Sequence, residues 1–199
     1  MNAEQISYYA NLAAFGVVLM MWGMFAVTIV RRKKLQSAPD TKRESRSWIG
    51  LVLQIAGIAI AWIPRTPYAS PLISNQFEIS IGLPIVSIIL AIISAWLAVL
   101  AIKELGKQWS IAARLIEGHK LVTTGVYSIV RHPIYTAMLG MLLATGLAVS
   151  HWLALASGLI VFMIGTRIRT NFEESLLSDA FGQEFTDWKA KVPGLIPFT

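Results

Sequence analysis

Two polar clusters border the last long uncharged stretch of the chain. His132 and Tyr135 lie at its start, and Arg169 and Glu173 follow its end. Because Arg169 and Glu173 are four residues apart, they would share one face of a helix. Pro133 suits the first turn of a helix, whose free backbone N–H groups favour an anionic ligand group. These types of side chain predict a site for a small ionic ligand that also carries an aromatic ring.

A purely structural interpretation of the same residues is also open. Arg131, His132 and Tyr135 could lie at a membrane surface as interfacial side chains. Arg169 and Glu173 could form a surface ion pair worth about 0.5 kcal/mol or less. A helical hairpin between the two clusters would nevertheless bring both to the same side of a membrane, and this proximity favours a shared site.

A loop bounded by Gly118 and Gly125 precedes the first cluster and continues to Tyr127. Glycine lets a backbone approach a ligand closely. Apolar and charged residues alternate irregularly before the loop, as is typical of a segment that lies on a membrane surface. We therefore expect the loop to contact the same ligand as the two clusters.

The elements that must position these residues are membrane-spanning helices. The chain has 199 residues, of which 55% are hydrophobic and only 14% are charged, whereas soluble domains carry about 25% charged residues. Uncharged stretches cover residues 5–30, 47–64, 79–102 and 133–166. A single helix over the fourth stretch would be about 50 Å long, too long for one crossing of a hydrocarbon core of about 30 Å. We interpret it as a hairpin that turns near residues 150–152, which predicts an all-α integral membrane protein with about five transmembrane helices.

The distribution of positive charge predicts the orientation of these helices. Every lysine and arginine except Arg65 falls on one side of the predicted spans, and such residues gather in cytoplasmic loops. This pattern places the N-terminus outside, the C-terminus in the cytoplasm and the ligand pocket on the cytoplasmic side. The net charge of +6 would attract anionic lipid headgroups to that face, and we expect no nucleic-acid partner. The absence of cysteine excludes thiol chemistry and disulfides.

Two regions follow from these assignments. Residues 1–102 would contain three N-terminal transmembrane helices. Residues 103–199 would form a catalytic region with a transmembrane hairpin over 133–168 and a cytoplasmic C-terminal tail.

The second region resembles the isoprenylcysteine carboxyl methyltransferases and related integral-membrane methyltransferases. The resemblance runs from about Leu105 to Pro197 and rests on four motifs in this order: H-K-L-V-T-T-G-V-Y at 119–127, R-H-P-I-Y at 131–135, R-x-x-x-E-E at 169–174, and F-G-Q-E-F-x-x-W-x-x-x-V-P-G-L-I-P at 181–197. Phe185 and Trp188 depart from the pattern, because tyrosines are frequent there in the family. The first two apolar stretches show no family motif, which leaves the identity of the methyl acceptor open.

The resemblance implies an S-adenosylmethionine-dependent methyltransferase without a metal, and we expect a prokaryotic member located in the cell membrane. Glu173 would meet the ammonium group of the cofactor, His132 and the loop backbone its carboxylate, and Tyr135 and Leu121 its adenosine. Arg169 would meet the carboxylate of the acceptor, and Arg169 and Glu173 would be the catalytic residues. The residues implied to bind the cofactor are His119, Lys120, Leu121, Val122, Tyr127, His132, Pro133, Ile134, Tyr135 and Glu173.

The expected reaction is methyl ester formation on the C-terminal carboxylate of a prenylated cysteine. A phospholipid amine or a small thiol is an alternative acceptor, and an amine would need a base such as Glu174 or His132 to remove its proton. An alternative of another class is an NADPH-dependent sterol-type membrane reductase, which resembles this family in its C-terminal half. A membrane protein without enzymatic activity is the simplest alternative.

Trp22, Trp109 and Trp188 are interpreted, with the other tryptophans, as interfacial anchors.

Overall fold

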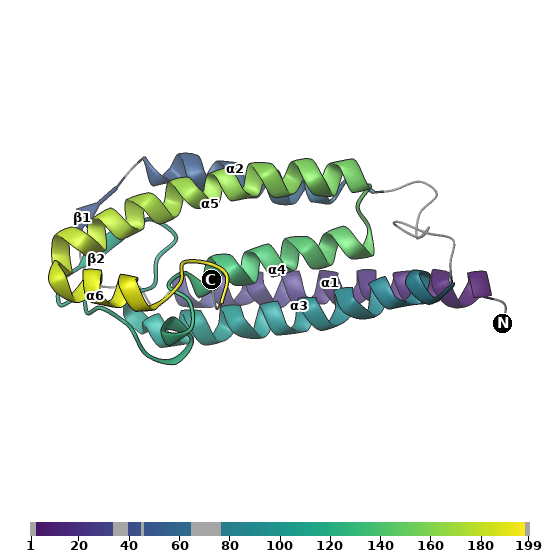
Figure 1. Cartoon of the computed structure of the whole chain (residues 1–199), viewed down its shortest axis with the longest axis horizontal. Helices are drawn as coiled ribbons and strands as arrows, with labels where there is room; N and C mark the ends of the chain where they lie inside the picture. Colours follow the sequence, from purple (N-terminus) through teal and green to yellow (C-terminus); the bar gives the residue numbers. More distant parts are fainter. Residues whose placement is uncertain (1–2, 34–39, 45, 65–76, 198–199) are drawn as a thin grey trace.

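Among the described residues, five of the six α-helices, α1 to α5, run alternately between the two ends of the molecule (Figure 1). This computed structural model describes residues 3–33, 40–44, 46–64 and 77–197. Arg65, the one basic residue expected on the outer side, lies outside the described residues. The elements in chain order are α1 (Ala3–Lys33), β1 (Asp40–Arg43), α2 (Ser47–Ala61), α3 (Phe77–Leu105), the 3-10 turn η1 (Gly106–Gln108), β2 (Arg114–Ile116), the 3-10 turn η2 (Gly125–Ser128), α4 (Pro133–Ala148), α5 (Trp152–Phe181) and α6 (Gln183–Lys191).

Three of these helices, α1, α3 and α5, are long and apolar enough to cross a membrane. The other two apolar helices, α2 and α4, have 15 and 16 residues and would reach about 22–24 Å. The mostly helical fold and three candidate spans are therefore established, and the prediction of five crossings stays a prediction. A turn joins α4 and α5 at residues 149–151, where the predicted hairpin was expected to turn, and the crossing of a membrane by both of its helices stays a prediction. Its second helix, however, does not end near residue 168 but continues to Phe181.

The extension of α5 has a physical cause in its apolar contacts beyond the span. Leu176 is buried against Ala113 and Leu115, so the helix has an apolar face to bury after its uncharged part has ended. This extension is important for the site, because it places Arg169 and Glu173 on a continuous helix rather than in a loop.

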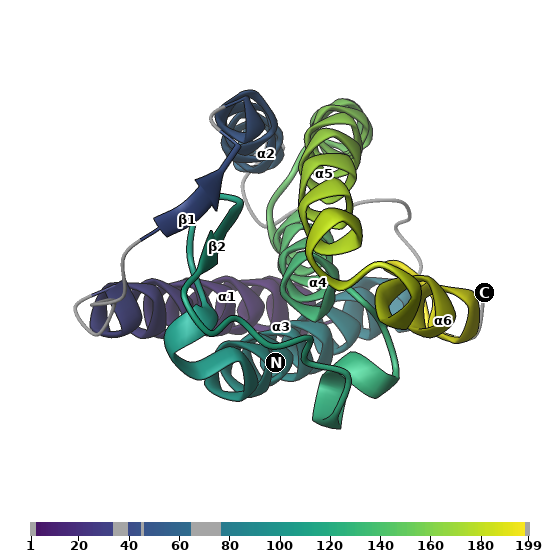
Figure 2. The ribbon, with the colours of Figure 1, turned by 90° about the vertical axis from the view of Figure 1, so that its left-hand side faces the viewer.

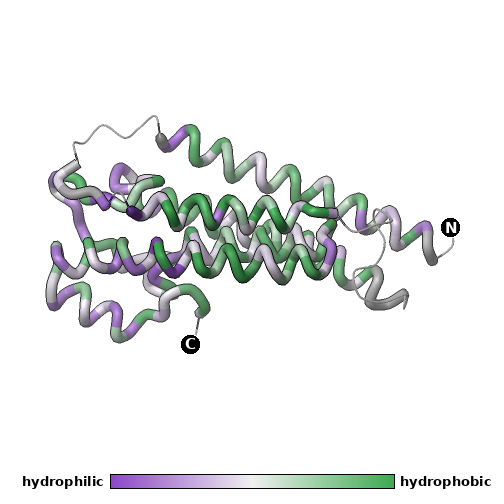
Figure 3. The backbone as a smooth tube through the Cα atoms, turned by 90° about the horizontal axis from the view of Figure 1, so that it is seen from above, coloured by the Kyte–Doolittle hydropathy of each residue, from purple (hydrophilic) through white to green (hydrophobic). Residues whose placement is uncertain are grey.

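Viewed end-on, the helices form two groups (Figure 2). Helix α2 lies beside α5, while α3 packs on α1 and α4. Hydrophilic residues gather at the end that carries β1, β2 and α6, which we call the polar end, and the middle of the bundle is mainly hydrophobic (Figure 3). The described residues therefore show the distribution of hydrophobic and hydrophilic residues expected of a membrane protein, with the hydrophilic residues concentrated at the polar end.

Helices α2 and α5 touch backbone to backbone. A Cβ added at Gly57 would lie 2.5 Å from the carbonyl oxygen of Gly158, and a Cβ at Gly158 would lie 2.6 Å from that of Gly57. Small residues permit such close packing between helices in a membrane, where van der Waals contact stabilises association. Nearer the polar end, a Cβ at Gly50 would lie 2.6 Å from Cγ of Arg169, so α2 runs directly along the stem of that arginine.

A two-stranded sheet at the polar end corrects the all-α prediction. Strands β1 and β2 pair antiparallel, with Asp40 opposite Ile116 and Arg43 opposite Arg114. The sequence of β1, D-T-K-R, has one β-branched residue, Thr41, and lacks the apolar alternation by which a strand is recognised. Its pairing is a tertiary contact between segments that are far apart in sequence, so local sequence could not predict it.

Candidate functional site

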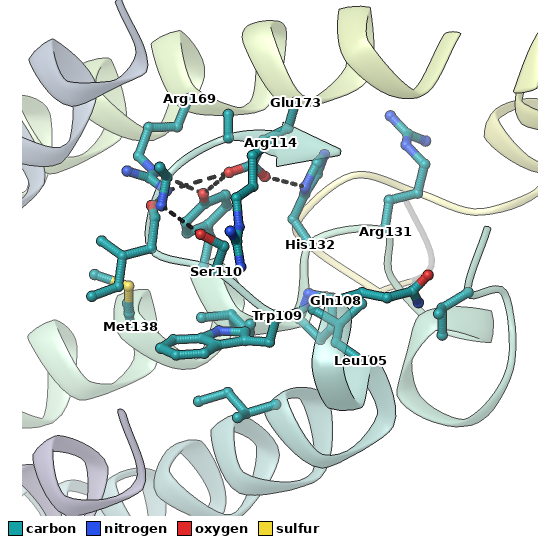
Figure 4. Close-up of a pocket in the computed structure, with 18 of the residues that line it drawn as sticks. Leu105, Gln108, Trp109, Ser110, Arg114, Arg131, His132, Met138, Arg169 and Glu173 are labelled. Atoms are coloured by element: carbon teal, nitrogen blue, oxygen red, sulfur yellow. Dashed lines mark hydrogen bonds and ion pairs between the residues drawn. The ribbon is translucent and has the colours of Figure 1, made fainter. Parts of the chain in front are cut away.

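A cavity of about 520 Å³ opens between the two helix groups and extends to the polar end. Every residue that the sequence assigned to the site lines it: Arg169, Glu173, His119, Lys120, Leu121, Val122, Tyr127, His132, Pro133, Ile134 and Tyr135. Figure 4 shows Arg169, Glu173 and His132 along one side, joined by hydrogen bonds and ion pairs, with Trp109 on the opposite side. The fold thus brings together residues from the loop, from α4 and from α5.

Tyr135, Arg169 and Glu173 form the centre of the polar network. The Tyr135 hydroxyl donates to Glu173 Oε1 and accepts a hydrogen bond of 2.7 Å from Arg169 Nε. Arg169 Nη2 donates to Glu173 Oε1 at 3.4 Å and to the carbonyl oxygen of Ile111 at 2.6 Å. The guanidinium also lies 5.4 Å from the centre of the Tyr135 ring, within range of a cation–π contact.

These contacts leave part of each charged group available to a ligand. Arg169 is only 4% exposed, and its Nη1 has no hydrogen-bond partner among the described residues, in contrast to Nε and Nη2. Glu173 Oε2 lies 3.6 Å from His132 Nδ1, a longer contact than those of Oε1. The cavity lining therefore includes a guanidinium nitrogen without a described partner, Arg169 Nη1, and a carboxylate oxygen, Glu173 Oε2, whose described contact is the longer one with His132.

His132 connects this centre to a second group of charges, made up of Glu174, Arg131 and Lys189. Its Nε2 lies 3.0 Å from Glu174 Oε1, and Glu174 also pairs with Arg131 at 2.9 Å and with Lys189 at 2.7 Å. Glu174 itself does not line the cavity. Glu174 therefore supports the site from behind, whereas Arg131 both pairs with Glu174 and lines the cavity.

The C-terminal segment covers the start of α4. Helix α4 begins at Pro133 with His132 as its N-cap, as predicted. The backbone N–H groups of Arg131 and His132 donate to the carbonyl oxygens of Pro193 and Gly194 at 2.8 and 3.0 Å. Arg131 Nη1 donates to the carbonyl oxygens of Lys189 and Val192. The tail thus holds the R-H-P-I-Y segment in place, and binding of a ligand carboxylate at this helix start remains a prediction.

The position of His132 between Glu173 and Glu174 determines its protonation. Burial lowers the pKa of His132, but hydrogen bonds to both glutamates and their negative charges raise it by more, so the net pKa lies above the usual 6.5. The folded protein therefore binds this proton more tightly than the unfolded chain does. Its contribution to stability is complete below about pH 6.5 and is lost as the pH rises through the pKa of the folded state.

We expect the unfolding temperature of the detergent-purified protein to fall as the pH is raised above about 6.5. His132→Gln should remove most of this slope, because glutamine keeps a hydrogen-bonding group without a proton to lose. His119→Gln serves as the control, since burial and Arg114 lower the pKa of His119 and its contribution changes only at lower pH. A slope that persists in His132→Gln would show that another group carries it.

The loop at residues 119–127 closes the cavity at the polar end. The Lys120 N–H donates to the side-chain oxygen of Gln108, while the Lys120 side chain is exposed. His119 Nδ1 is buried without a hydrogen-bond partner among the described residues. The buried Tyr127 hydroxyl donates to the carbonyl oxygen of Ala101 at 3.4 Å, and burial, with the charges of Glu173 and Glu104, raises the pKa of Tyr127 above its usual value. Tyr127 is therefore neutral and supports the cavity wall.

Several residues of the lining were not predicted. Trp22, Trp109 and Trp188 all line the cavity, so the interpretation of all tryptophans as interfacial anchors is wrong for these three. Trp109 is only 4% exposed, and Trp188 Nε1 is buried without a described partner. Trp48, Trp96 and Trp152 are largely exposed, as anchors would be.

Gln54 on α2 also lines the cavity and was not singled out, although a polar residue inside an apolar stretch is a signal for a functional site.

The cavity is apolar on the side away from the polar end. Its walls there consist of residues from α1 and α2, namely Trp22, Phe25, Ala26, Ile29, Leu51, Ile55 and Ile58. Ile55 lines this half and is 57% exposed, so the apolar half is not fully enclosed at α2. One cavity thus joins a charged half to an apolar half, an arrangement that suits one water-soluble and one lipid-soluble ligand.

Comparison with known proteins agrees with the sequence motifs. The model of a family described as phospholipid methyltransferase matches residues 83–184. Protein-S-isoprenylcysteine O-methyltransferase B of Arabidopsis thaliana is 35% identical over 89 residues, which are 44% of this chain and 45% of that protein. A probable protein-S-isoprenylcysteine O-methyltransferase of Oryza sativa subsp. indica is 29% identical over 115 residues, or 57% of this chain and 60% of the relative. The Homo sapiens protein-S-isoprenylcysteine O-methyltransferase is 34% identical over 80 residues, or 40% and 28%. The chain therefore aligns with only about a quarter to three fifths of the length of these relatives.

Proposed function

The chain belongs to the phospholipid methyltransferase family, and on this premise we propose that it transfers a methyl group from S-adenosylmethionine to a lipophilic acceptor at the membrane. The proposed acceptor is the C-terminal carboxylate of a prenylated cysteine, as the names of the matched relatives indicate for those proteins. The observation that carries this proposal is the unused Nη1 of buried Arg169 at the junction of the charged and apolar halves of the cavity.

The residues of the charged half fit the cofactor. When bound, S-adenosylmethionine supplies an electrophilic methyl group on a sulfonium, next to an ammonium, a carboxylate and an adenosine. Glu173 Oε2 would accept from the ammonium. Because both ring nitrogens of His132 face glutamates, His132 would act on the carboxylate through its charge, and the loop backbone and Trp188 Nε1 would donate hydrogen bonds. Tyr135 and Leu121 would pack on the adenosine.

Arg169 would orient the acceptor. A C-terminal carboxylate has a reference pKa of about 3.5 and is ionised near neutrality, so no general base is needed. Tyr135 and Glu173 fix the guanidinium plane through Nε and Nη2, and Nη1 would hold one carboxylate oxygen so that the other faces the methyl group. Both reactants lose their charge during the transfer, so the exclusion of water by the buried lining should lower the barrier.

A lipid tail would enter the apolar half from the bilayer, between α1 and α2, while the cofactor enters from the polar end. The positive charge at the polar end favours placing it in the cytoplasm, with α2 and α4 completing a five-helix membrane domain. Anionic headgroups would surround this face.

The structure offers less support for an amine acceptor. The candidate bases His132 and Glu174 are engaged with one another and with Arg131 and Lys189. Removal of a proton from an amine would have to displace one of these ion pairs first. A carboxylate acceptor requires no such step.

Methyl transfer from radiolabelled S-adenosylmethionine tests the proposal. We expect the purified protein to methylate N-acetyl-S-farnesylcysteine, with a rate at saturating cofactor that does not rise between about pH 6 and pH 9, because the acceptor carboxylate is ionised throughout this range. Preferred methylation of phosphatidylethanolamine or of a small thiol, with a rate that rises over this range, would contradict the carboxylate assignment. Binding of NADPH without binding of S-adenosylhomocysteine would contradict methyl transfer altogether.

A further inference from the structure

Gln54 is a polar residue in the apolar half of the cavity that the proposed mechanism does not use. It lies near the middle of α2, is 0% exposed and lines the cavity next to Leu51 and Ile55. Its Nε2 donates a hydrogen bond of 2.9 Å to Thr166 Oγ1 on α5. Its Oε1 is buried and has no hydrogen-bond partner among the described residues.

The unpaired oxygen has no structural explanation in the packing of α2 on α5. A hydrogen bond between side chains of neighbouring helices stabilises their association in a membrane, and this accounts for the amide nitrogen. It does not account for Oε1, because a buried carbonyl oxygen without a partner is unfavourable. A leucine would fill the same space without that cost. The cavity that Gln54 lines is where a partner for this oxygen could come from.

Gln54 lies one helical turn from Arg169, on its apolar side. Thr166, its partner, precedes Arg169 by three residues on α5, which corresponds to about 4.5 Å along the helix. On α2, Gly50 precedes Gln54 by one turn and lies against the stem of Arg169, since a Cβ at Gly50 would be 2.6 Å from Arg169 Cγ. A ligand group on Arg169 thus has Gln54 as its next polar neighbour toward the apolar half.

We propose that Gln54 Oε1 accepts a hydrogen bond from the amide N–H adjacent to the acceptor carboxylate, so that the enzyme prefers a prenylated residue with an intact amide over a simple lipid acid. This inference rests on the proposed function. The amide nitrogen of an acylated amino acid is two bonds from the carboxylate carbon. With a hydrogen bond of about 3 Å at each end, such a group spans two side chains that are one helical turn apart. A hydrocarbon chain in this position would leave Oε1 unsatisfied.

Binding in the presence of S-adenosylhomocysteine tests this inference without requiring turnover. The probes are N-acetyl-S-farnesylcysteine and S-farnesyl-3-mercaptopropionate, which is the same molecule without the acetamido group. We expect calorimetric titration of the wild-type protein in detergent to show about tenfold tighter binding of the acetamido compound. In Gln54→Leu this ratio should fall close to one, mainly through weaker binding of the acetamido compound. Gln54→Met, which also lacks the oxygen, replaces it if Gln54→Leu does not fold.

Two controls separate recognition from helix packing. Thr166→Val removes the hydrogen bond between the helices and should keep the tenfold ratio, although the unfolding temperature falls. The N-methylated amide of N-acetyl-S-farnesylcysteine keeps the acetyl carbonyl but lacks the N–H, and it should bind like the mercaptopropionate. Binding of the N-methylated amide as tight as that of the parent would overturn the inference.

Equal binding of the two probes by the wild-type protein, absence of binding, or an unchanged ratio in Gln54→Leu would also overturn it. A methyl-transfer assay on the same samples separates the two proposals. A protein that shows the preference but transfers no methyl group contradicts the proposed function and leaves the role of Gln54 standing. A protein that methylates both probes without preference contradicts the role of Gln54 and leaves the function standing.

Discussion

Arg169→Ala is expected to lower methyl transfer by about 100-fold or more while binding of S-adenosylhomocysteine is retained. Misplacement of a reacting group by about 1 Å can cost about 100-fold in rate, and alanine removes the only group proposed to hold the acceptor carboxylate. Arg169 is also positioned by three described oxygens, those of Tyr135, Ile111 and Glu173. Arg169→Lys should recover little activity, because an ammonium cannot reproduce the planar arrangement of N–H groups that these partners require.

Arg167→Ala is the matched control, since Arg167 is an exposed arginine two residues earlier on the same helix and does not line the cavity. It should retain nearly full activity. Methyl transfer is measured at saturating cofactor, and S-adenosylhomocysteine affinity is measured by calorimetry. An Arg169→Ala variant that loses cofactor affinity in parallel with activity would place Arg169 at the cofactor instead of the acceptor.

Glu173→Gln is expected to weaken S-adenosylhomocysteine binding by about tenfold or more. Hydrogen bonds to charged groups contribute about 1.5–3 kcal/mol, and the variant loses the charge that would meet the ammonium group. Its neighbour Glu174 provides an unusually close comparison, because it directs its carboxylate to Arg131, His132 and Lys189 and lies outside the cavity lining.

Glu174→Gln should therefore lower the unfolding temperature and leave cofactor affinity nearly unchanged. Calorimetric titration of both variants, with thermal unfolding measured in parallel, distinguishes the two glutamates. Equal loss of cofactor affinity in both variants would show that the whole charge network, rather than Glu173 itself, determines binding. Unchanged affinity in Glu173→Gln would exclude the assigned ammonium contact.

The candidate site was largely predictable because charged residues are rare in this chain. His132, Arg169 and Glu173 stand next to long uncharged stretches, so their positions at the borders of helices already indicated a common location. The start of α4 at Pro133 and the turn before Trp152 followed from the same pattern. Pairing of charges was less predictable. Glu173 and Glu174 are adjacent in sequence but contact different partners. Which partners each one contacts depends on the direction in which its side chain leaves α5.

What could not be predicted depends on contacts between distant segments. Strand β1 exists because it pairs with β2, and Trp109 enters the cavity because the segment after α3 folds back over it. Gln54 lies at the cavity and contacts Thr166 because α2 packs on α5. The matching seven-residue spacing of Gly50 with Gly57 and of Gly158 with Gly165 was the sequence signal for that packing, and it becomes meaningful only once the two helices are known to be neighbours.

The backbone contact between α2 and α5 has a consequence for acceptor selectivity. Since Gly57 and Gly158 leave no room for sliding, the spacing between Gln54 and Arg169 is as fixed as the helices themselves, whereas the facing wall of α1 offers only apolar side chains. Such a cavity would be strict about the head of its acceptor and permissive about its tail. Farnesyl and geranylgeranyl chains would then be tolerated alike, while small changes around the carboxylate would not.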